Sequence, residues 1–228
     1  MNKRQWIIAG LALLVTAGVG GGLYFANRAV PPPITASTAE VIGADELHVM
    51  GDPAAKVTLI EYAALACPFC AAFNNTIVPA LKEKYVATGK VRYVLRLIAI
   101  DIADAKAEGL ATCMGKDKFD TAVDLLYRRQ DEWGPEQMGE HGVAPDAQPK
   151  TDAGLTKIGR ALGLDEAKIF SCLRDSNALD RLQRTAEHGG TRYGLTGTPT
   201  LIVNGQIVTT PRSPEDLAKI LDPLLEGN

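Results

Sequence analysis

The sequence has few of the histidines and cysteines from which zinc sites are built. Its three histidines, His48, His141 and His188, are widely separated, and two of its four cysteines, Cys113 and Cys172, lie far apart in the chain. A zinc site needs a second pair of ligands at a spacing comparable to the first, so the sequence argues against one. We expect no metal and no organic cofactor.

Basic residues are not in excess either. Lys3 and Arg4 account for two of the 24 Lys and Arg, so the remaining 22 face 27 acidic residues, a net charge of −5 with neutral histidines. No basic stripe is present, so nucleic-acid binding has no electrostatic support. The chain also lacks internal repeats and a heptad pattern that would form a dimerisation helix, and we expect a monomer.

One long hydrophobic run is present, at 6–26, directly after the basic residues. Twenty-one helical residues span about 31 Å, close to the hydrocarbon core of a bilayer. The apolar part of a secretory signal is shorter, about 7–15 residues. We therefore expect an uncleaved signal anchor in the inner membrane, with residues 1–5 in the cytoplasm. A cleaved signal peptide and a buried core helix are the alternatives.

Residues 27–46 read as a tether to an exported domain. Three consecutive prolines, 31–33, favour an extended polyproline segment, and small polar residues follow them. Fully extended, such a tether reaches about 60 Å. Disulfides persist in the oxidising periplasm, so cysteines in the exported part are expected to be paired.

A cysteine pair lies where a predicted buried strand, 56–63, passes into a helix. Pro68 suits the first helical position, so Cys67 faces the unpaired N–H groups of the first turn, which favour a thiolate. Cys70 lies one turn further on, close enough to bridge. Half of a zinc site and an inert disulfide are the alternatives. The helical pattern continues through Phe73, Ile77, Leu81 and Tyr85.

The remaining elements follow from periodicity and turn signals. Extended segments are expected at 48–53, 90–98, 200–203 and 206–209, the last two joined by the hairpin turn Asn204-Gly205. The pattern is helical from 101 to 192, apart from a loop rich in Pro and Gly at 134–150. Ser213 is expected to cap a last helix that begins at Pro214.

This order of elements resembles the DsbA-type thiol:disulfide oxidoreductases. The resemblance covers about residues 47–226 and rests on Glu61, on Cys67-Pro68-Phe69-Cys70 and on the block at 197–205. It implies an α/β chain with a thioredoxin fold, made of 47–100 and 193–228, with an all-helical subdomain, 101–192, inserted in it. The expected transmembrane or signal-anchor helix precedes this fold.

The resemblance also implies roles for individual residues. Cys67 matches the family's exposed nucleophile, and Cys70 matches the buried partner that resolves the mixed disulfide. Pro199 matches a cis-proline beside the pair, which would turn the backbone of Thr198 towards an extended substrate. Glu61 matches a buried acid that exchanges a proton with Cys70. The alternative for Glu61 is an edge or paired carboxylate.

Phe69 departs from the family pattern. Oxidising members often have a histidine between the two cysteines, which helps to hold the thiolate. Phenylalanine can stabilise the thiolate neither by charge nor by hydrogen bonding. We therefore expect a higher pKa for the Cys67 thiol and a less oxidising disulfide. Phe69 and Thr198 are also expected to contact substrate.

Cys113 and Cys172 lie on or beside the apolar faces of two predicted helices. We predict that they form a structural disulfide, which would stabilise the fold by about 4 kcal/mol in the chain-entropy account. Two buried free thiols are the alternative.

The sequence therefore predicts a thiol–disulfide oxidoreductase that acts on exported proteins in the periplasm, most simply as a disulfide donor. Its substrates would be unfolded or extended chains that contain cysteine. The family resemblance implies that a quinone-linked membrane oxidase, or a membrane reductase, resets the Cys67–Cys70 pair. A disulfide isomerase or reductase of the same fold and a non-catalytic thioredoxin-fold chaperone are the alternative functions.

Overall fold

The computed structural model describes residues 48–134 and 148–226 of the 228-residue chain. The signal anchor predicted at 6–26, the tether at 27–46 and most of the loop predicted at 134–150 lie outside the described residues. Among the helices that are described, none is long and apolar enough to cross a membrane.

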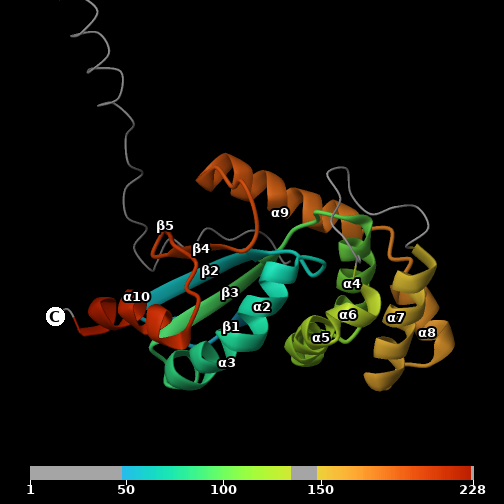
Figure 1. Ribbon diagram of the computed structural model, residues 1–228, viewed down its shortest axis with the longest axis horizontal. Helices are drawn as coiled ribbons and strands as arrows, with labels where there is room; N and C mark the ends of the chain where they lie inside the picture. Colours follow the sequence, from blue (N-terminus) through green and yellow to red (C-terminus); the bar gives the residue numbers. More distant parts are fainter. Residues whose placement is uncertain (1–47, 135–147, 227–228) are drawn as a thin grey trace, which may run out of the picture. The chain divides into compact units, whose positions relative to one another are not determined.

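A five-stranded mixed sheet forms the centre of the fold, in the order β1-β3-β2-β4-β5 (Figure 1). Strands β2 and β3 are parallel, and the other neighbouring pairs are antiparallel. The apolar, β-branched runs form strands because both faces of the sheet are buried. All the predicted strands are confirmed: β1 (Val49–Met50), β2 (Val57–Ala63), β3 (Val91–Leu97), β4 (Thr200–Val203) and β5 (Gln206–Val208).

The hairpin between β4 and β5 has the predicted two-residue turn. Asn204 has φ 47° and Gly205 has φ 84°, the left-handed conformation that such a turn needs at both positions. The Asn204 Oδ1 also accepts a hydrogen bond of 2.9 Å from the Thr58 N–H. This bond ties the turn to the central strand β2.

Helices cover both faces of the sheet (Figure 1). One face carries α2 (Pro68–Thr76), α3 (Val78–Leu81), the π-helical segment η2 (Lys82–Val86) and α10 (Pro214–Glu226), and the other carries α9 (Ala178–Tyr193). The Ser213 Oγ accepts from the Asp216 N–H at 3.2 Å, which confirms the predicted cap of α10.

The helix predicted to run on past Phe73 to Tyr85 is not continuous. It breaks at Ile77, between α2 and α3, and widens into η2 after Leu81. Pro79 explains the first break, because it has no N–H to donate to the carbonyl of the preceding turn.

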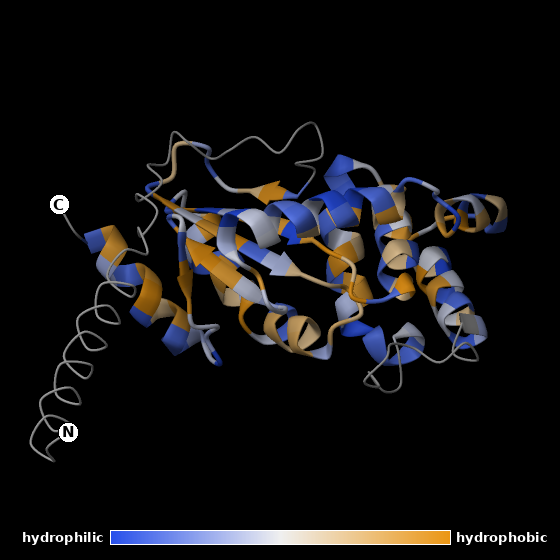
Figure 2. Cartoon of the chain, turned by 90° about the horizontal axis from the view of Figure 1, so that it is seen from above, coloured by the Kyte–Doolittle hydropathy of each residue, from blue (hydrophilic) through white to orange (hydrophobic). Residues whose placement is uncertain are grey.

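The segment between β3 and β4 is helical, as predicted. It contains α4 (Ile102–Thr112), α5 (Lys116–Arg128), α6 (Gln130–Trp133), α7 (Gln148–Ala161), α8 (Glu166–Cys172) and α9. Because α7 begins at Gln148, the predicted loop ends earlier than expected. Hydrophobic residues are concentrated on the central strands, whereas the helices carry both hydrophobic and hydrophilic residues (Figure 2).

The disulfide predicted between Cys113 and Cys172 is present. Its S–S distance is 2.01 Å and its Cα–Cα distance is 5.9 Å, and it joins the C-terminal end of α4 to the end of α8. The two helices approach closely here, since a Cβ at Gly109 would lie 2.4 Å from the Cys172 carbonyl oxygen. The bridge therefore closes an already tight helix pair.

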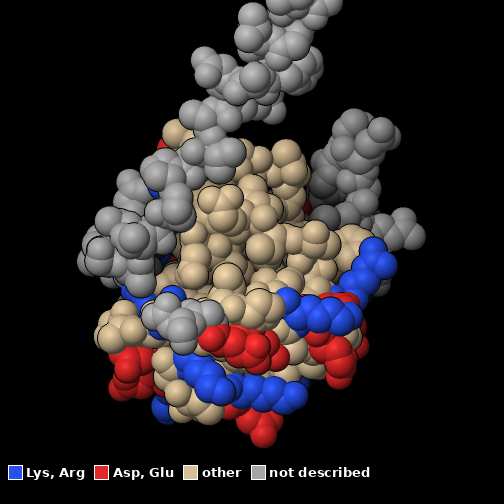
Figure 3. All heavy atoms as spheres, turned by 90° about the vertical axis from the view of Figure 1, so that its left-hand side faces the viewer, with Lys and Arg blue, Asp and Glu red and all other residues tan. Residues whose placement is uncertain are grey.

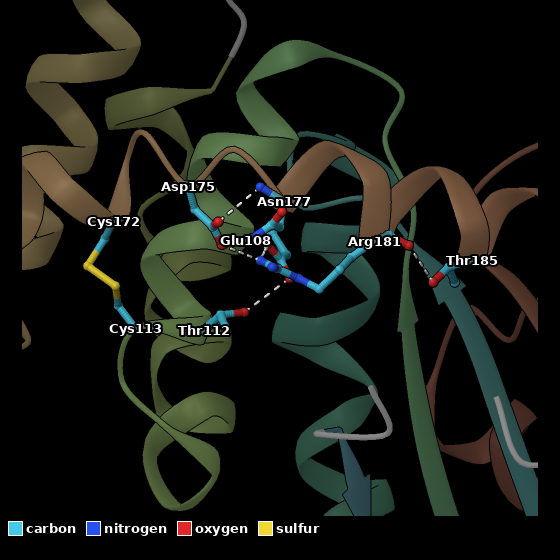
Figure 4. Close-up of polar contacts among 8 residues, drawn as sticks. All are labelled: Glu108, Thr112, Cys113, Cys172, Asp175, Asn177, Arg181 and Thr185. Atoms are coloured by element: carbon cyan, nitrogen blue, oxygen red, sulfur yellow. Dashed lines mark hydrogen bonds and ion pairs between the residues drawn. A yellow bond between two sulfur atoms is a disulfide. The ribbon is translucent and has the colours of Figure 1, made fainter. Parts of the chain in front are cut away.

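An ion-pair network braces α9 against α4 (Figure 4). The Arg181 guanidinium donates to both carboxylate oxygens of Glu108, at 2.8 and 2.6 Å, and to Asp175 at 2.7 Å. Thr112 also donates to Glu108, at 3.0 Å. Because Glu108 is only 3% exposed, its charge depends on these partners.

The surface on the side of α10 and β5 has no dominant charge (Figure 3). Basic and acidic side chains alternate along one part of this face, and an uncharged area lies beside them.

Removal of Arg181 tests the brace. We expect Arg181→Ala to lower the free energy of unfolding by about 2–4 kcal/mol, because Glu108 is left as a buried charge without its guanidinium. Urea denaturation followed by circular dichroism measures the loss.

Arg160→Ala is the matched control. The side chains of its ion pair with Glu166 are 57% and 66% exposed, so solvent screens the pair and its loss should cost much less than the loss of Arg181. Equal losses in the two variants would contradict a special role for the α4–α9 brace.

Candidate active site

The two cysteines of the Cys-x-x-Cys motif lie at the junction of β2 and α2, as predicted. Cys67 is the N-cap residue of α2, with extended backbone angles, and Pro68 is the first helical residue. The Cys67 N–H closes a turn by donating to the Ala64 carbonyl at 3.1 Å. Cys70 then follows one helical turn later on the inner side, and both cysteines are free thiols.

The environments of the two thiols give them opposite acidities. The pKa of Cys67 is lowered to about 6, chiefly by a hydrogen bond from the Cys70 thiol. The side chain of Thr198 and the backbone N–H groups of Cys70 and Phe69 lower it further, whereas burial opposes the shift. The pKa of Cys70 is raised far above its usual range, first by burial and then by its bond to Cys67 and the negative charge of Glu61. Cys67 is therefore the thiolate and Cys70 the thiol.

The expectation that Cys67 is exposed is wrong for this structure. Cys67 is only 2% exposed, whereas its neighbour Phe69 is 73% exposed. The reason is the loop before β4, in which the Thr198 carbonyl oxygen lies 3.6 Å from the Cys67 Sγ. The Thr198–Pro199 bond of this loop is cis, as the family resemblance implied.

Glu61 lies on the central strand β2 and is buried, not at an edge. It is 1% exposed, and its Oε2 accepts a hydrogen bond from the Tyr93 hydroxyl. Burial raises the pKa of Glu61 to about 7, against the opposing effect of the Tyr93 hydrogen bond. A carboxyl group that is half ionised near neutrality is suited to proton exchange with a thiol.

Three side chains of the helical insertion hold the turn before Cys67. The Asp104 Oδ1 accepts from the Ala66 N–H at 2.7 Å, and the Gln130 amide donates to the carbonyls of Leu65, at 2.6 Å, and of Cys67, at 3.0 Å. The Tyr127 hydroxyl donates to the Ala64 carbonyl at 3.3 Å. The insertion thus gives side-chain partners to backbone groups of the turn, including the Cys67 carbonyl, which also accepts from the Ala71 N–H of α2 at 3.0 Å.

These holding residues were not found by sequence reasoning. Asp104 shows one local signal, because it belongs to the capping box that starts α4 at Asp101. Nothing in that motif indicates that the same carboxylate reaches Ala66. Gln130 and Tyr93 carry no sequence signal at all.

Apolar side chains are exposed close to the cysteines. Phe69 precedes Cys70. Ile100 lies on the loop before α4, where its N–H shares the Asp104 carboxylate with the Ala66 N–H, and Ile102 is the first residue of α4. Ile102 is 47% exposed and Ile100 is 38% exposed. Exposed apolar groups around a reactive sulfur are typical of a surface that binds another chain.

The other two cysteines are not part of this site, since Cys113 lies at the end of α4 opposite Asp104. In the part of the chain that the structure describes, no group of three or more His, Cys, Asp or Glu side chains is arranged to hold a metal. The structure thus brings together Cys67, Cys70, Glu61, Thr198 and Pro199, and leaves Cys113 and Cys172 in a structural role.

Known proteins with similar sequences share the cysteine-pair region. A family model described as thioredoxin matches residues 44–223. A Rickettsia bellii protein named as a protein-disulfide oxidoreductase is 29% identical over 179 residues, which cover 78% of this chain and 64% of that protein. The chain thus spans less than two thirds of the length of this relative.

Solved structures share the fold. The crystal structure of alpha-DsbA1 from Wolbachia pipientis matches with a TM-score of 0.67 at 21% identity, over 84% of this chain and 96% of that chain. A protein-disulfide isomerase from Novosphingobium aromaticivorans matches with a TM-score of 0.67 at 24% identity, over 78% and 97%. The predicted thioredoxin fold with a helical insertion is therefore confirmed.

The acidity of Cys67 provides a direct test of the site. The rate at which iodoacetamide alkylates Cys67 should rise with pH around a midpoint of about 6. In Cys70→Ala this midpoint should move up by more than one unit, because the hydrogen bond from the Cys70 thiol is the largest cause of the low pKa.

Cys70→Ser serves as the matched control, since its hydroxyl keeps a hydrogen-bond donor at the same place and should retain part of the shift. A midpoint that stays the same in Cys70→Ala would show that the Cys70 thiol is not what holds the Cys67 thiolate.

Proposed function

Because the chain belongs to the thioredoxin family whose model matches residues 44–223, we propose that it is a protein thiol:disulfide oxidoreductase. One observation carries the proposal: a thiol with a pKa of about 6 at the start of α2 is hydrogen-bonded to a second thiol whose pKa is raised. A stabilised thiolate beside a protonated partner is the arrangement that thiol–disulfide exchange needs. The name of the Rickettsia bellii relative supports the same activity.

In the oxidising direction, a substrate thiolate attacks the Cys67 sulfur of the Cys67–Cys70 disulfide. The bond between the two cysteines breaks, a substrate–Cys67 bond forms, and Cys70 leaves as a thiolate that takes a proton from Glu61. A second substrate thiolate then attacks the substrate sulfur of the mixed disulfide and releases Cys67 as a thiolate. Two electrons pass from the substrate thiols to the cysteine pair.

The substrate would be an extended segment that contains cysteine. Thr198 lies beside the Cys67 sulfur in the loop that leads to β4, and the backbone of this loop would pair with an added strand. The exposed side chains of Phe69, Ile100 and Ile102 offer apolar contacts. Such a surface favours unfolded chains over one defined ligand.

We further propose that the enzyme works outside the cytoplasm, in the periplasm, as a monomer. The hydrophobic run at 6–26 would anchor it in the inner membrane, with a soluble periplasmic form after signal cleavage as the alternative. A quinone-linked membrane oxidase would restore the Cys67–Cys70 disulfide after each turnover. The presence of the Cys113–Cys172 bridge supports an oxidising compartment.

The favoured direction is disulfide donation. The low pKa of Cys67 supports this direction, because a stabilised thiolate makes the reduced form more stable and the disulfide more oxidising. Phe69 limits the effect, since an apolar ring between the cysteines adds no charge to hold the thiolate. We therefore expect a disulfide that oxidises less strongly than those with a histidine at this position.

Loss of Cys67 tests the activity. Cys67→Ser should reduce the rate of disulfide formation in reduced ribonuclease A at least about 100-fold, because the attacked sulfur is gone. The double variant Cys113→Ala/Cys172→Ala, assayed below its own melting temperature, should retain most of the rate. A Cys67→Ser variant that still promotes refolding would point instead to a thioredoxin-fold chaperone.

Phe69→His tests the expected redox poise. A histidine beside the thiolate should lower the pKa of Cys67 and raise the reduction potential by about 30 mV for each tenfold gain in thiolate stability. Equilibration with glutathione measures the potential. Phe69→Ala is the control, since it removes the ring without adding charge, and equal potentials in the two variants would contradict the account.

A further inference from the structure

The two oxygens of the Glu61 carboxyl group have different surroundings. Oε2 accepts a hydrogen bond from the Tyr93 hydroxyl, whereas Oε1 is buried and has no hydrogen-bond partner among the described residues. Buried polar atoms are almost always satisfied, and an exception in a native fold calls for an explanation, of which a catalytic role is one. Here the exception belongs to a residue whose charge acts on Cys70.

The sheet register makes this contact specific. Glu61 is opposite Leu95, and Leu59 is opposite Tyr93, so Tyr93 is the diagonal neighbour of Glu61 on the same face of the sheet. Both residues are 1% exposed, so water does not compete for the bond. Tyr93 therefore determines which carboxylate oxygen of Glu61 accepts its hydrogen bond.

No cation is paired directly with Glu61 among the described residues. Lys82 lowers the pKa of Glu61, but its Nζ is held by both carboxylate oxygens of Asp124, at 2.8 and 2.9 Å. Four surrounding elements carry titratable or charged groups that interact electrostatically with Glu61. These groups are Cys67 and Cys70 at α2, Lys82 of η2, Tyr93 of β3 and Tyr127 of α5.

We propose that Tyr93 is a positioning residue for the proton step, which holds Oε2 of Glu61 so that Oε1 exchanges the proton with Cys70. This inference rests on the proposed function. When Cys70 attacks a mixed disulfide, its thiol proton passes to Oε1, and the thiolate forms a bond with the Cys67 sulfur. The bond between Cys67 and the substrate breaks, and the substrate leaves as a thiolate.

The hydroxyl of Tyr93 also keeps Glu61 partly ionised at neutral pH. A donor to the carboxylate lowers the carboxyl pKa, so its removal raises the pKa above about 7. In Tyr93→Phe, Glu61 still gives a proton to Cys70 but takes one up poorly. The variant should therefore slow the attack by Cys70 and spare the oxidation of substrate.

The first measurement is the titration of Glu61 itself, by ¹³C NMR of the reduced full chain labelled at glutamate Cδ. The Glu61 resonance is identified by its absence in Glu61→Gln. In Tyr93→Phe the midpoint should rise by about one pH unit, a tenfold change in the acid dissociation constant. An unchanged midpoint overturns the proposal.

Tyr62→Phe is the matched control. Tyr62 is also a buried tyrosine of the sheet, but its hydroxyl accepts from Arg96 at 2.7 Å, and it points to the opposite face from Glu61. Its loss should leave the Glu61 midpoint in place. An equal shift in Tyr62→Phe would mean that any loosening of the sheet moves the midpoint, which overturns a specific role for Tyr93.

The second measurement is the release of glutathione from a Cys67–glutathione mixed disulfide by Cys70. At pH 7 Tyr93→Phe should release it about fivefold more slowly, because the ionised fraction of Glu61 falls from about one half to about one tenth. In Glu61→Gln, the further change Tyr93→Phe should have no effect. The same slowing in both backgrounds overturns the proposal.

Failure of the proposed function would look different. A wild-type protein that does not form disulfides in ribonuclease A would refute the oxidoreductase activity, whatever the NMR titration gives. The shift of the Glu61 midpoint in Tyr93→Phe does not depend on turnover, so it supports or overturns the positioning role by itself.

Discussion

The hydrogen bond between the Cys70 and Cys67 thiols is the interaction on which the chemistry of this site depends. It makes one sulfur acidic and the other resistant to ionisation, although both belong to the same turn of helix. The bond exists because Cys67 is the N-cap of α2 and Cys70 comes one turn later, on the buried side. Two thiols of equal acidity would give no preferred point of attack.

Burial makes this asymmetry large and also creates a need for a proton carrier. Cys70 lies among apolar residues below the surface, so its thiolate is costly and its proton has no direct route to solvent. The carboxyl group of Glu61, on the preceding strand β2, has its own pKa raised by the same burial. The low dielectric that impedes ionisation of the Cys70 thiol therefore also raises the pKa of Glu61, the acid that exchanges a proton with it.

The helical insertion supports the site mechanically. The side chains of Asp104, Tyr127 and Gln130 extend from three helices to the turn before Cys67. The Asp104 carboxylate accepts a hydrogen bond from the N–H of Ala66, the residue before the nucleophile. The insertion is itself tied together by the Cys113–Cys172 bridge and by the Glu108–Arg181 ion pair. These contacts hold the reactive turn in one geometry, as a preorganised site requires.

Local signals in the sequence were sufficient to predict the strands, the cysteine pair at a helix start, the Asn204-Gly205 turn and the cap at Ser213. Each of these depends on residues within a few positions of one another, so spacing alone carries the information. The break at Pro79 was missed although its cause, a missing N–H, is also local. The family resemblance then indicated the cis bond before Pro199.

Only the tertiary structure decided how buried Cys67 is and which side chains surround it. The loop at Thr198 comes 131 residues later in the chain, and Gln130 comes 63 residues later. Tyr93 meets Glu61 because β2 and β3 pair in one register, which the composition of neither strand specifies. By itself the sequence determined that a thiolate would form at the start of a helix. The contacts that bury this thiolate and place its proton carrier are formed by packing between distant segments. They could not be predicted because hydrogen bonds across such separations produce no periodic pattern in the sequence.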